Sequence, residues 1–161
     1  MRSLDELAKT VGKTMTARDL TLATSESLTG GLLGAVITSV PGSSAYYLGG
    51  AVAYATAMKA RLSGVERGIL ATYGVVSEQT VTEMAMGIQV LTGADWAIAV
   101  SGVAGPDPQE GTPPVKCGSA SSARGSARWI RPSSRTASSS TVTGRPSASR
   151  PSRPAWNCCW P

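Results

Sequence analysis

The chain has 161 residues, of which 42% are hydrophobic and 16% are charged, and its formal net charge is +5. That length suits one domain with a real core. The sequence shows neither a run of about 20 apolar residues, which a membrane-spanning helix needs, nor a secretory leader. Because it contains no histidine, it cannot supply a Ser-His-Asp triad or a His-ligated metal. We therefore expect a cytoplasmic protein without a membrane partner.

Hydrophobic periodicity predicts helices that alternate with strands up to about residue 100. Ser3 followed by Glu6 is a capping box, and Ser77 is a good N-cap for a longer helix. Gly49 and Gly50 indicate a bulge or a close backbone approach within a strand. The alternation predicts a layered α/β/α single domain. In chain order we expect a helix to about Thr16, a strand over 20–24, a helix over 29–39, a strand over 45–55, short helices over 58–62 and 66–72, a helix from Ser77, and a strand over 96–100. The helix from Ser77 is expected to bury one face, which consists of Val81, Met84, Ala85, Ile88 and Leu91.

The composition changes after Glu110. Up to that residue the chain has ten acidic and seven basic residues, whereas the remainder has eight basic residues and no acidic ones. The remainder also contains all three cysteines and twelve serines, but no leucine. Two different kinds of sequence are therefore joined. The basic excess that would favour a nucleic-acid partner belongs to the second kind alone.

Residues 25–31 carry the strongest local signal for chemistry. They run Ser-Glu-Ser-Leu-Thr-Gly-Gly, at the point where a buried strand turns into a helix. Backbone N–H groups converge at such a turn and can hold an anion or a developing oxyanion. Since no cysteine precedes Cys117, a nucleophile here has to be Ser or Thr, with Lys, a carboxylate or Tyr as its base. An ordinary turn capped by Thr29 or Ser27 is the structural alternative.

Two further segments lie where an α/β sheet places ligands. Residues 54–59, Tyr-Ala-Thr-Ala-Met-Lys, follow the strand that contains the glycine pair. Residues 101–106, Ser-Gly-Val-Ala-Gly-Pro, form a Gly-rich loop after another strand. Taken alone, Lys59 reads as a surface charge and the Gly-rich loop as a plain turn.

Together these segments resemble the ordered motifs of the CinA C-terminal family, which includes stand-alone nicotinamide mononucleotide amidases. The family motifs are A-E-S-C-T-G-G, P-G-S-S, Y-S-N-x-x-K, H-G-A-V-S and (S/T)-G-I-A-G-P. They match residues 25–31, 41–44, 54–59, 73–77 and 101–106 in that order. The resemblance implies an amide hydrolase of pyridine nucleotide salvage, which converts nicotinamide mononucleotide (NMN) to nicotinic acid mononucleotide and ammonia. It implies no metal and no organic cofactor, and we expect a homo-oligomer.

The resemblance also implies which residues form the site. Ser27 matches the nucleophile, and Lys59 matches the base that takes its proton. That role requires a neutral Lys59, hence a buried one with a depressed pKa. Thr29, Gly30 and Gly31 are expected to bring backbone donors to the tetrahedral intermediate or to the substrate phosphate. The full set of implied substrate-binding residues is Thr29, Gly30, Gly31, Ser44, Tyr54, Ser101 and Gly102.

The segment 115–161, a Ser/Arg/Pro-rich tail, departs from the family, so we place the domain at 1–114. A G-D-R motif, whose Arg resembles a phosphate ligand, and a final Leu-rich helix are both missing. We interpret the tail as the product of a frameshift between Glu110 and Cys117. Reading the third base of each codon with the next two turns Trp156–Pro161 into Glu-Leu-Leu-Leu-Ala, whichever codons are used. As written, residues 117–161 are expected to lack packed structure.

Two other interpretations of the chain stay open. In the first, the tail is a disordered basic arm that binds nucleic acid through charge. That view leaves the shifted Glu-Leu-Leu-Leu-Ala unexplained, so we do not expect a nucleic-acid partner. In the second, the whole chain is a non-catalytic nucleotide-binding remnant, which keeps the early strands and helices but lacks the G-D-R arginine.

Overall fold

The computed structural model of the chain describes residues 3–103, 105, 116–123 and 126–130. Within these residues no helix is long and apolar enough to cross a membrane. The elements are α1 (Leu4–Ala17), β1 (Leu22–Glu26), α2 (Leu32–Thr38), the 3-10 helix η1 (Ser43–Ala45), β2 (Tyr47–Val52), α3 (Thr56–Ser63), α4 (Arg67–Tyr73), α5 (Glu78–Thr92), β3 (Trp96–Val103), β4 (Lys116–Ala123) and β5 (Ser126–Ile130).

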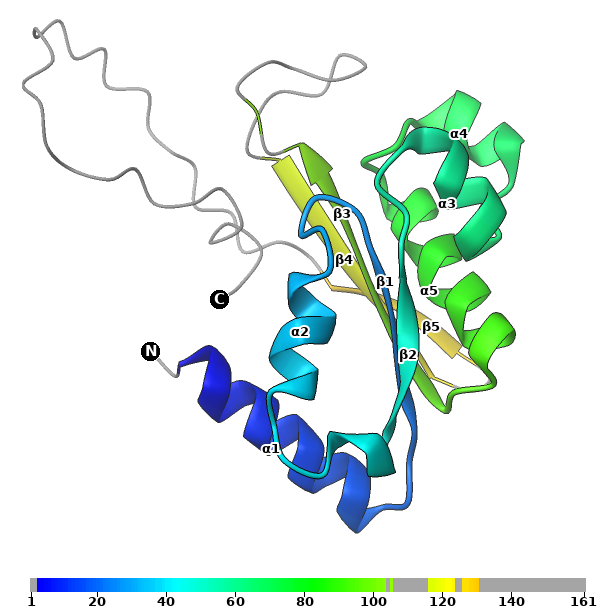
Figure 1. Cartoon of the computed structure of the whole chain (residues 1–161). Helices are drawn as coiled ribbons and strands as arrows, with labels where there is room; N and C mark the ends of the chain where they lie inside the picture. Colours follow the sequence, from blue (N-terminus) through cyan, green and yellow to red (C-terminus); the bar gives the residue numbers. More distant parts are fainter. Residues whose placement is uncertain (1–2, 104, 106–115, 124–125, 131–161) are drawn as a thin grey trace, which may run out of the picture.

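The strands form one sheet, in the order β2-β1-β3-β4-β5. The helices α1 and α2 cover one face of the sheet, and α3, α4 and α5 cover the other (Figure 1). This arrangement confirms the predicted α/β/α layers. It arises because the chain passes from β1 to β2 through α2 on one face, and from β2 to β3 through the other three helices on the opposite face.

The sheet gathers the ends of its three parallel strands at one edge. In the register of β1, Glu26 pairs with Val52 of β2 and with Val100 of β3. The carboxyl ends of these strands therefore meet beside the residue that follows β1, which is Ser27. In open α/β sheets ligands bind at such an edge, where the connections switch from one face to the other.

The strand β1 begins and ends two residues later than predicted. All five of its residues are buried, since helices cover both of its faces. Ser25 and Glu26 are therefore strand residues rather than members of a turn. Ser27 is therefore the first residue after the strand, and the later end of β1 determines which side chains can contact Ser27.

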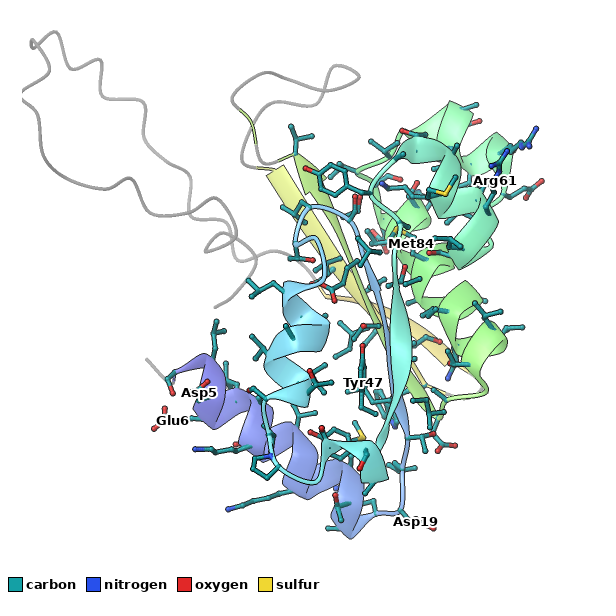
Figure 2. The ribbon with its side chains drawn as sticks, in the orientation of Figure 1. Asp5, Glu6, Asp19, Tyr47, Arg61 and Met84 are labelled. Atoms are coloured by element: carbon teal, nitrogen blue, oxygen red, sulfur yellow. The ribbon has the colours of Figure 1, made fainter. Side chains whose placement is uncertain are left out.

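The glycine pair of β2 produces both features that the sequence indicated. The pairing with β1 skips Leu48, so the strand bulges there, and Gly49 has a φ of 136°. A Cβ atom on Gly50 would overlap Thr24 and the hydroxyl of Tyr47. Tyr47 lies between β2 and α2 (Figure 2), and its hydroxyl is 2.6 Å from the Thr24 hydroxyl. Burial raises the pKa of Tyr47 above its usual value.

The helix α5 supplies most of the core on its face of the sheet. The Ser77 side chain caps it by accepting a hydrogen bond from the Thr80 N–H at 3.1 Å, as predicted. Met84 points from α5 towards the sheet (Figure 2). The prediction for Leu91 is wrong, because this side chain is 68% exposed in the last turn of the helix. The residues of the predicted face that are buried are Val81, Met84, Ala85 and Ile88.

The sheet continues past residue 114, where the sequence analysis ended the domain. Strand β4 pairs antiparallel with β3, and β5 pairs with β4. The expectation of no packed structure is therefore wrong for 117–123 and 126–130. The physical reason is that the open edge of β3 offers backbone hydrogen bonds that need no particular side chain. Ala120 and Ser122 are small enough to be buried there. The rest of the predicted tail, including the shifted frame's final helix, lies outside the described residues.

Candidate active site

Ser27 and Lys59 meet at the carboxyl edge of the parallel strands. The backbone N–H of Ser27 donates to the Val100 carbonyl at 3.0 Å, which fixes the residue beside β3. Lys59 lies near the start of α3, and its Nζ is 2.9 Å from the Ser27 Oγ and 3.1 Å from the Ala53 carbonyl oxygen. Ser27 is 5% exposed and Lys59 is 2% exposed. The structure thus brings the two predicted catalytic residues into direct contact.

Two features act on the charge of Lys59 in opposite directions, since its burial disfavours the ammonium form and its contact with the Ala53 carbonyl oxygen favours it. A buried ammonium group loses its hydration, and burial therefore shifts the equilibrium towards the uncharged amine. A neutral amine at 2.9 Å from a hydroxyl oxygen can accept the hydroxyl proton. The pair can therefore act as a nucleophile and its base.

Glu26 is the residue of this site that sequence reasoning missed. It is 2% exposed, and its Oε2 accepts hydrogen bonds from the Thr29 hydroxyl at 2.6 Å, the Gly31 N–H at 3.2 Å and the Leu33 N–H at 2.9 Å. Its Oε1 accepts from the Gly34 N–H at 2.8 Å. The carboxylate therefore occupies the position at the start of α2 that the sequence analysis gave to a substrate anion. An acidic residue four positions before the Gly30-Gly31 pair was the available signal.

The expected role of the turn donors needs correction. The Thr29 hydroxyl and the Gly31 N–H are bound to the carboxylate described above, and the Gly30 N–H donates to the Ser27 carbonyl at 3.0 Å. Within the described part of the chain, the backbone N–H groups of Leu28 and Thr29 have no acceptor. The N–H of the residue after a nucleophile commonly serves the oxyanion. These two N–H groups are therefore the donors that the turn leaves for an oxyanion.

Removing the Glu26 carboxylate should destabilise the protein strongly. Glu26→Ala leaves three backbone N–H groups and one hydroxyl without their acceptor, so we expect unfolding free energy to fall by at least about 3 kcal/mol. Glu26→Gln keeps one acceptor oxygen, and its loss should be smaller. Urea unfolding measures both. The control is Glu6→Ala in the exposed capping box of α1, which should cost less, because water can replace an exposed acceptor. An equal loss for Glu6→Ala and Glu26→Ala would contradict this account.

Tyr54 lies beside the Ser27–Lys59 pair. It follows Ala53, whose N–H donates to the Glu26 carbonyl at 2.6 Å and whose own carbonyl is bonded to Lys59. Its side chain is 66% exposed. Tyr54 thus offers an exposed aromatic side chain, one residue after Ala53, to a ligand at this edge.

Ser101 and Gly102 also lie at this edge, at the carboxyl end of β3. Ser101 is 1% exposed, and its hydroxyl donates to the Val75 carbonyl at 2.7 Å. The hydroxyl therefore ties β3 to the loop that precedes α5. Gly102 is half-buried and pairs with Cys117 of β4. The structure brings both residues to the site but commits the Ser101 hydroxyl to a structural bond.

Ser44 is the one predicted site residue that the structure places elsewhere. It is exposed and lies in η1, before β2 begins. Because β2 is six residues long and runs parallel to β1, η1 lies at the amino edge of the sheet. That edge is about 20 Å from Ser27 at the usual rise per strand residue. Within one chain, Ser44 is therefore not part of the site, because the order of motifs in a sequence does not reveal which edge of the sheet each occupies.

The comparisons with known proteins converge on one family. The profile of the CinA C-terminal domain matches residues 4–128. A CinA-like protein of Frankia casuarinae is 48% identical over 109 residues, 68% of this chain and 25% of that protein. A CinA-like protein of Synechococcus sp. (strain CC9311) is 46% identical over 109 residues, with the same shares. The chain thus spans about a quarter of the length of these curated relatives.

Solved structures show the same likeness over most of the chain. The competence damage-inducible protein A (ComA) of Klebsiella pneumoniae is 38% identical with a TM-score of 0.77, over 80% of this chain and 81% of that one. A competence or damage-inducible protein of Enterobacter asburiae is 35% identical with a TM-score of 0.78, over 81% and 82% of the two chains.

Proposed function

The chain belongs to the CinA C-terminal domain family, and from that premise we propose that it is an amide hydrolase that converts NMN to nicotinic acid mononucleotide and ammonia. The observation that carries the proposal is the 2.9 Å contact between the buried Lys59 Nζ and the Ser27 Oγ. A serine has to lose its proton to become a good nucleophile, and a neutral lysine in contact with it is a suitable base.

The first half of the reaction forms an ester on Ser27. Its Oγ attacks the carboxamide carbon while the Lys59 Nζ takes the hydroxyl proton, and the carbonyl electron pair moves to the oxygen. That oxyanion is stabilised by the free N–H groups of Leu28 and Thr29. Lys59 then gives its proton to the amide nitrogen, the C–N bond breaks and ammonia leaves. The Ala53 carbonyl holds the ammonium form of Lys59 in the interval.

The second half of the reaction returns the serine. Lys59 takes a proton from water, and the resulting hydroxide attacks the ester carbon. The bond from that carbon to the Ser27 Oγ breaks, the proton returns to Oγ, and nicotinic acid mononucleotide is released. Each proton moves between Lys59 and one other atom, so this mechanism asks no other titratable side chain to act.

One feature of the chain supports NMN as the substrate class. The ring of NMN is a pyridinium cation, and the exposed aromatic face of Tyr54 can attract a cation at this edge. In the family the phosphate would pair with the arginine of the G-D-R motif, which the chain as written lacks. The alternative function is a nucleotide-binding remnant without turnover, which keeps the early strands and helices but lacks this arginine.

The ester on Ser27 provides the test of this proposal. Acid quenching during turnover, digestion and mass spectrometry should find the nicotinate mononucleotide group on the peptide that contains Ser27. Ser27→Ala should yield no such adduct. If the unchanged protein and Ser27→Ala turn NMN over equally fast, and neither carries an adduct on this peptide, another group is the nucleophile.

A further inference from the structure

The helix α3, which carries Lys59, buries only two side chains, and both are polar. They are Lys59 and Ser63. The Ser63 hydroxyl lies 2.7 Å from the hydroxyl of Ser25 in β1, and both serines are 0% exposed. Ser25 lies in β1, and Ser27 follows it by two residues, just past the end of the strand. Lys59 and Ser63 are four apart and share one face of the helix. Two polar contacts thus run side by side between the same two segments.

We propose that the Ser25–Ser63 hydrogen bond is a positioning contact, which holds α3 so that Lys59 stays within reach of the Ser27 hydroxyl. The proposal rests on the proposed function, because it gives Lys59 the role of base. Neither Ser25 nor Ser63 touches the reacting atoms in this account. They act through the helix.

The other attachments of α3 explain why this bond matters. No side chain caps the start of the helix, and its apolar contribution to the neighbouring core cluster is the partly buried Met58. At its other end the helix lies directly against α5, since a Cβ atom on Gly87 would overlap the Ser63 carbonyl. Ser63 therefore contacts α5 through its backbone and β1 through its hydroxyl, one helical turn away from Lys59. A hydrogen bond at that point fixes the distance of the helix from the strand.

The position of the helix matters because of the reach of lysine. The side chain of Lys59 is long and flexible, so the place of its Nζ depends on where the helix backbone lies. A shift of about 1 Å in a reacting group can cost about a hundredfold in rate. The Ser25–Ser63 hydrogen bond is short, buried and directional, and it holds α3 against β1 one helical turn away from Lys59.

The test uses Ser25→Ala, Ser63→Ala and the double variant in the full chain. The matched control is Tyr47→Phe, which removes a hydroxyl from the hydrogen bond with Thr24 between β1 and β2, on the other side of β1. Two properties are measured in each protein. The first is the pH dependence of kcat and KM for NMN. The second is the titration of Lys59, followed by NMR of a 13Cε-labelled lysine, which needs no substrate.

We expect each serine variant to lose about tenfold in kcat while KM stays within about threefold. Water that reaches a looser Lys59 favours the ammonium form. The acid limb of the kcat profile and the Lys59 titration should therefore both move to higher pH. The double variant should match the single ones, because all three lack the same bond. Tyr47→Phe should lose stability without either change.

The proposal is overturned if the serine variants lose only stability and keep the wild-type kcat and Lys59 titration. The titration also separates this proposal from the proposed function. If the protein fails to hydrolyse NMN, a titration that moves in both serine variants but not in Tyr47→Phe still supports the positioning contact. A titration that is the same in all of these proteins rejects it.

Discussion

Replacing Ser27 by alanine should lower kcat for NMN by about a thousandfold or more, and so should replacing Lys59. Ser27→Ala removes the atom that attacks the carboxamide. Lys59→Met fills a similar volume but cannot take the proton, so Ser27 stays a neutral and weak nucleophile. Because the two residues act on one step, the double variant should be little worse than either single one. Steady-state ammonia release measures all three.

The controls for this prediction separate the base from a mere positive charge. Lys59→Arg keeps a cation, but a guanidinium does not lose its proton in proteins, so this variant should be as inactive as Lys59→Met. Lys13→Ala removes an exposed lysine of α1 and should leave kcat unchanged. Near-normal turnover by Ser27→Ala or Lys59→Arg would show that the assigned pair does not perform the reaction.

Restoring the reading frame after Glu110 should raise the affinity for NMN by at least about tenfold, since paired bonds between an arginine and a phosphate contribute about 1.5–3 kcal/mol. The same change replaces the final Pro-rich segment by a Leu-rich helix. Each leucine that becomes buried adds about 1.5–3 kcal/mol, so the unfolding temperature should rise as well. Titration calorimetry and thermal unfolding of the written and restored chains measure the two effects.

The nucleotide sequence provides the control for this prediction. Across codons 105–161 it should show a one-base insertion or deletion before codon 117. Otherwise it should show the written frame, with codons that begin at the third base of the present ones and still encode the family's sequence. Written and restored chains with equal affinity and equal stability would mean that the tail is dispensable. Our explanation of what the tail lost would then be incorrect.

Local patterns were sufficient to predict the layered fold. The capping box of Ser3 and Glu6 and the N-cap at Ser77 both form, because each depends on residues a few positions apart. The contact of Ser27 with Lys59 was expected from the family resemblance, not from periodicity. The two residues are 32 positions apart in the sequence, so nothing local indicates that their side chains meet.

The parts of the site that could not be predicted depend on tertiary contacts. Ser25 and Ser63 are 38 residues apart, and each reads alone as an ordinary small polar residue. The sequence pattern places Glu26 in a turn, because it predicts a strand over 20–24, two residues earlier than β1. Because Glu26 is in the strand, its carboxylate lies at the start of α2 and accepts hydrogen bonds from the backbone N–H groups of Leu33 and Gly34. A two-residue error in one strand thus changed the predicted anion site.

The composition of the tail misled for a related reason. Ser and Ala are weak strand formers, so residues 116–123 give little sign of a strand. The edge of β3 nevertheless pairs with them along eight residues. Composition indicates only the secondary structure that side chains favour. An unpaired strand edge offers backbone N–H and C=O groups, which can form hydrogen bonds with a neighbouring segment of almost any sequence. The frameshift interpretation concerns which side chains lie on β4, and that interpretation stays a prediction.

The most direct test of the central claim is the product analysis of NMN incubated with the frame-restored chain in the presence of a metal chelator. Our account predicts ammonia and nicotinic acid mononucleotide in equal amounts, at a rate that the chelator does not change. Calorimetry on the same sample should show that the protein binds NMN. Binding without any product from a folded chain would contradict the account, and would identify the protein as a nucleotide-binding remnant.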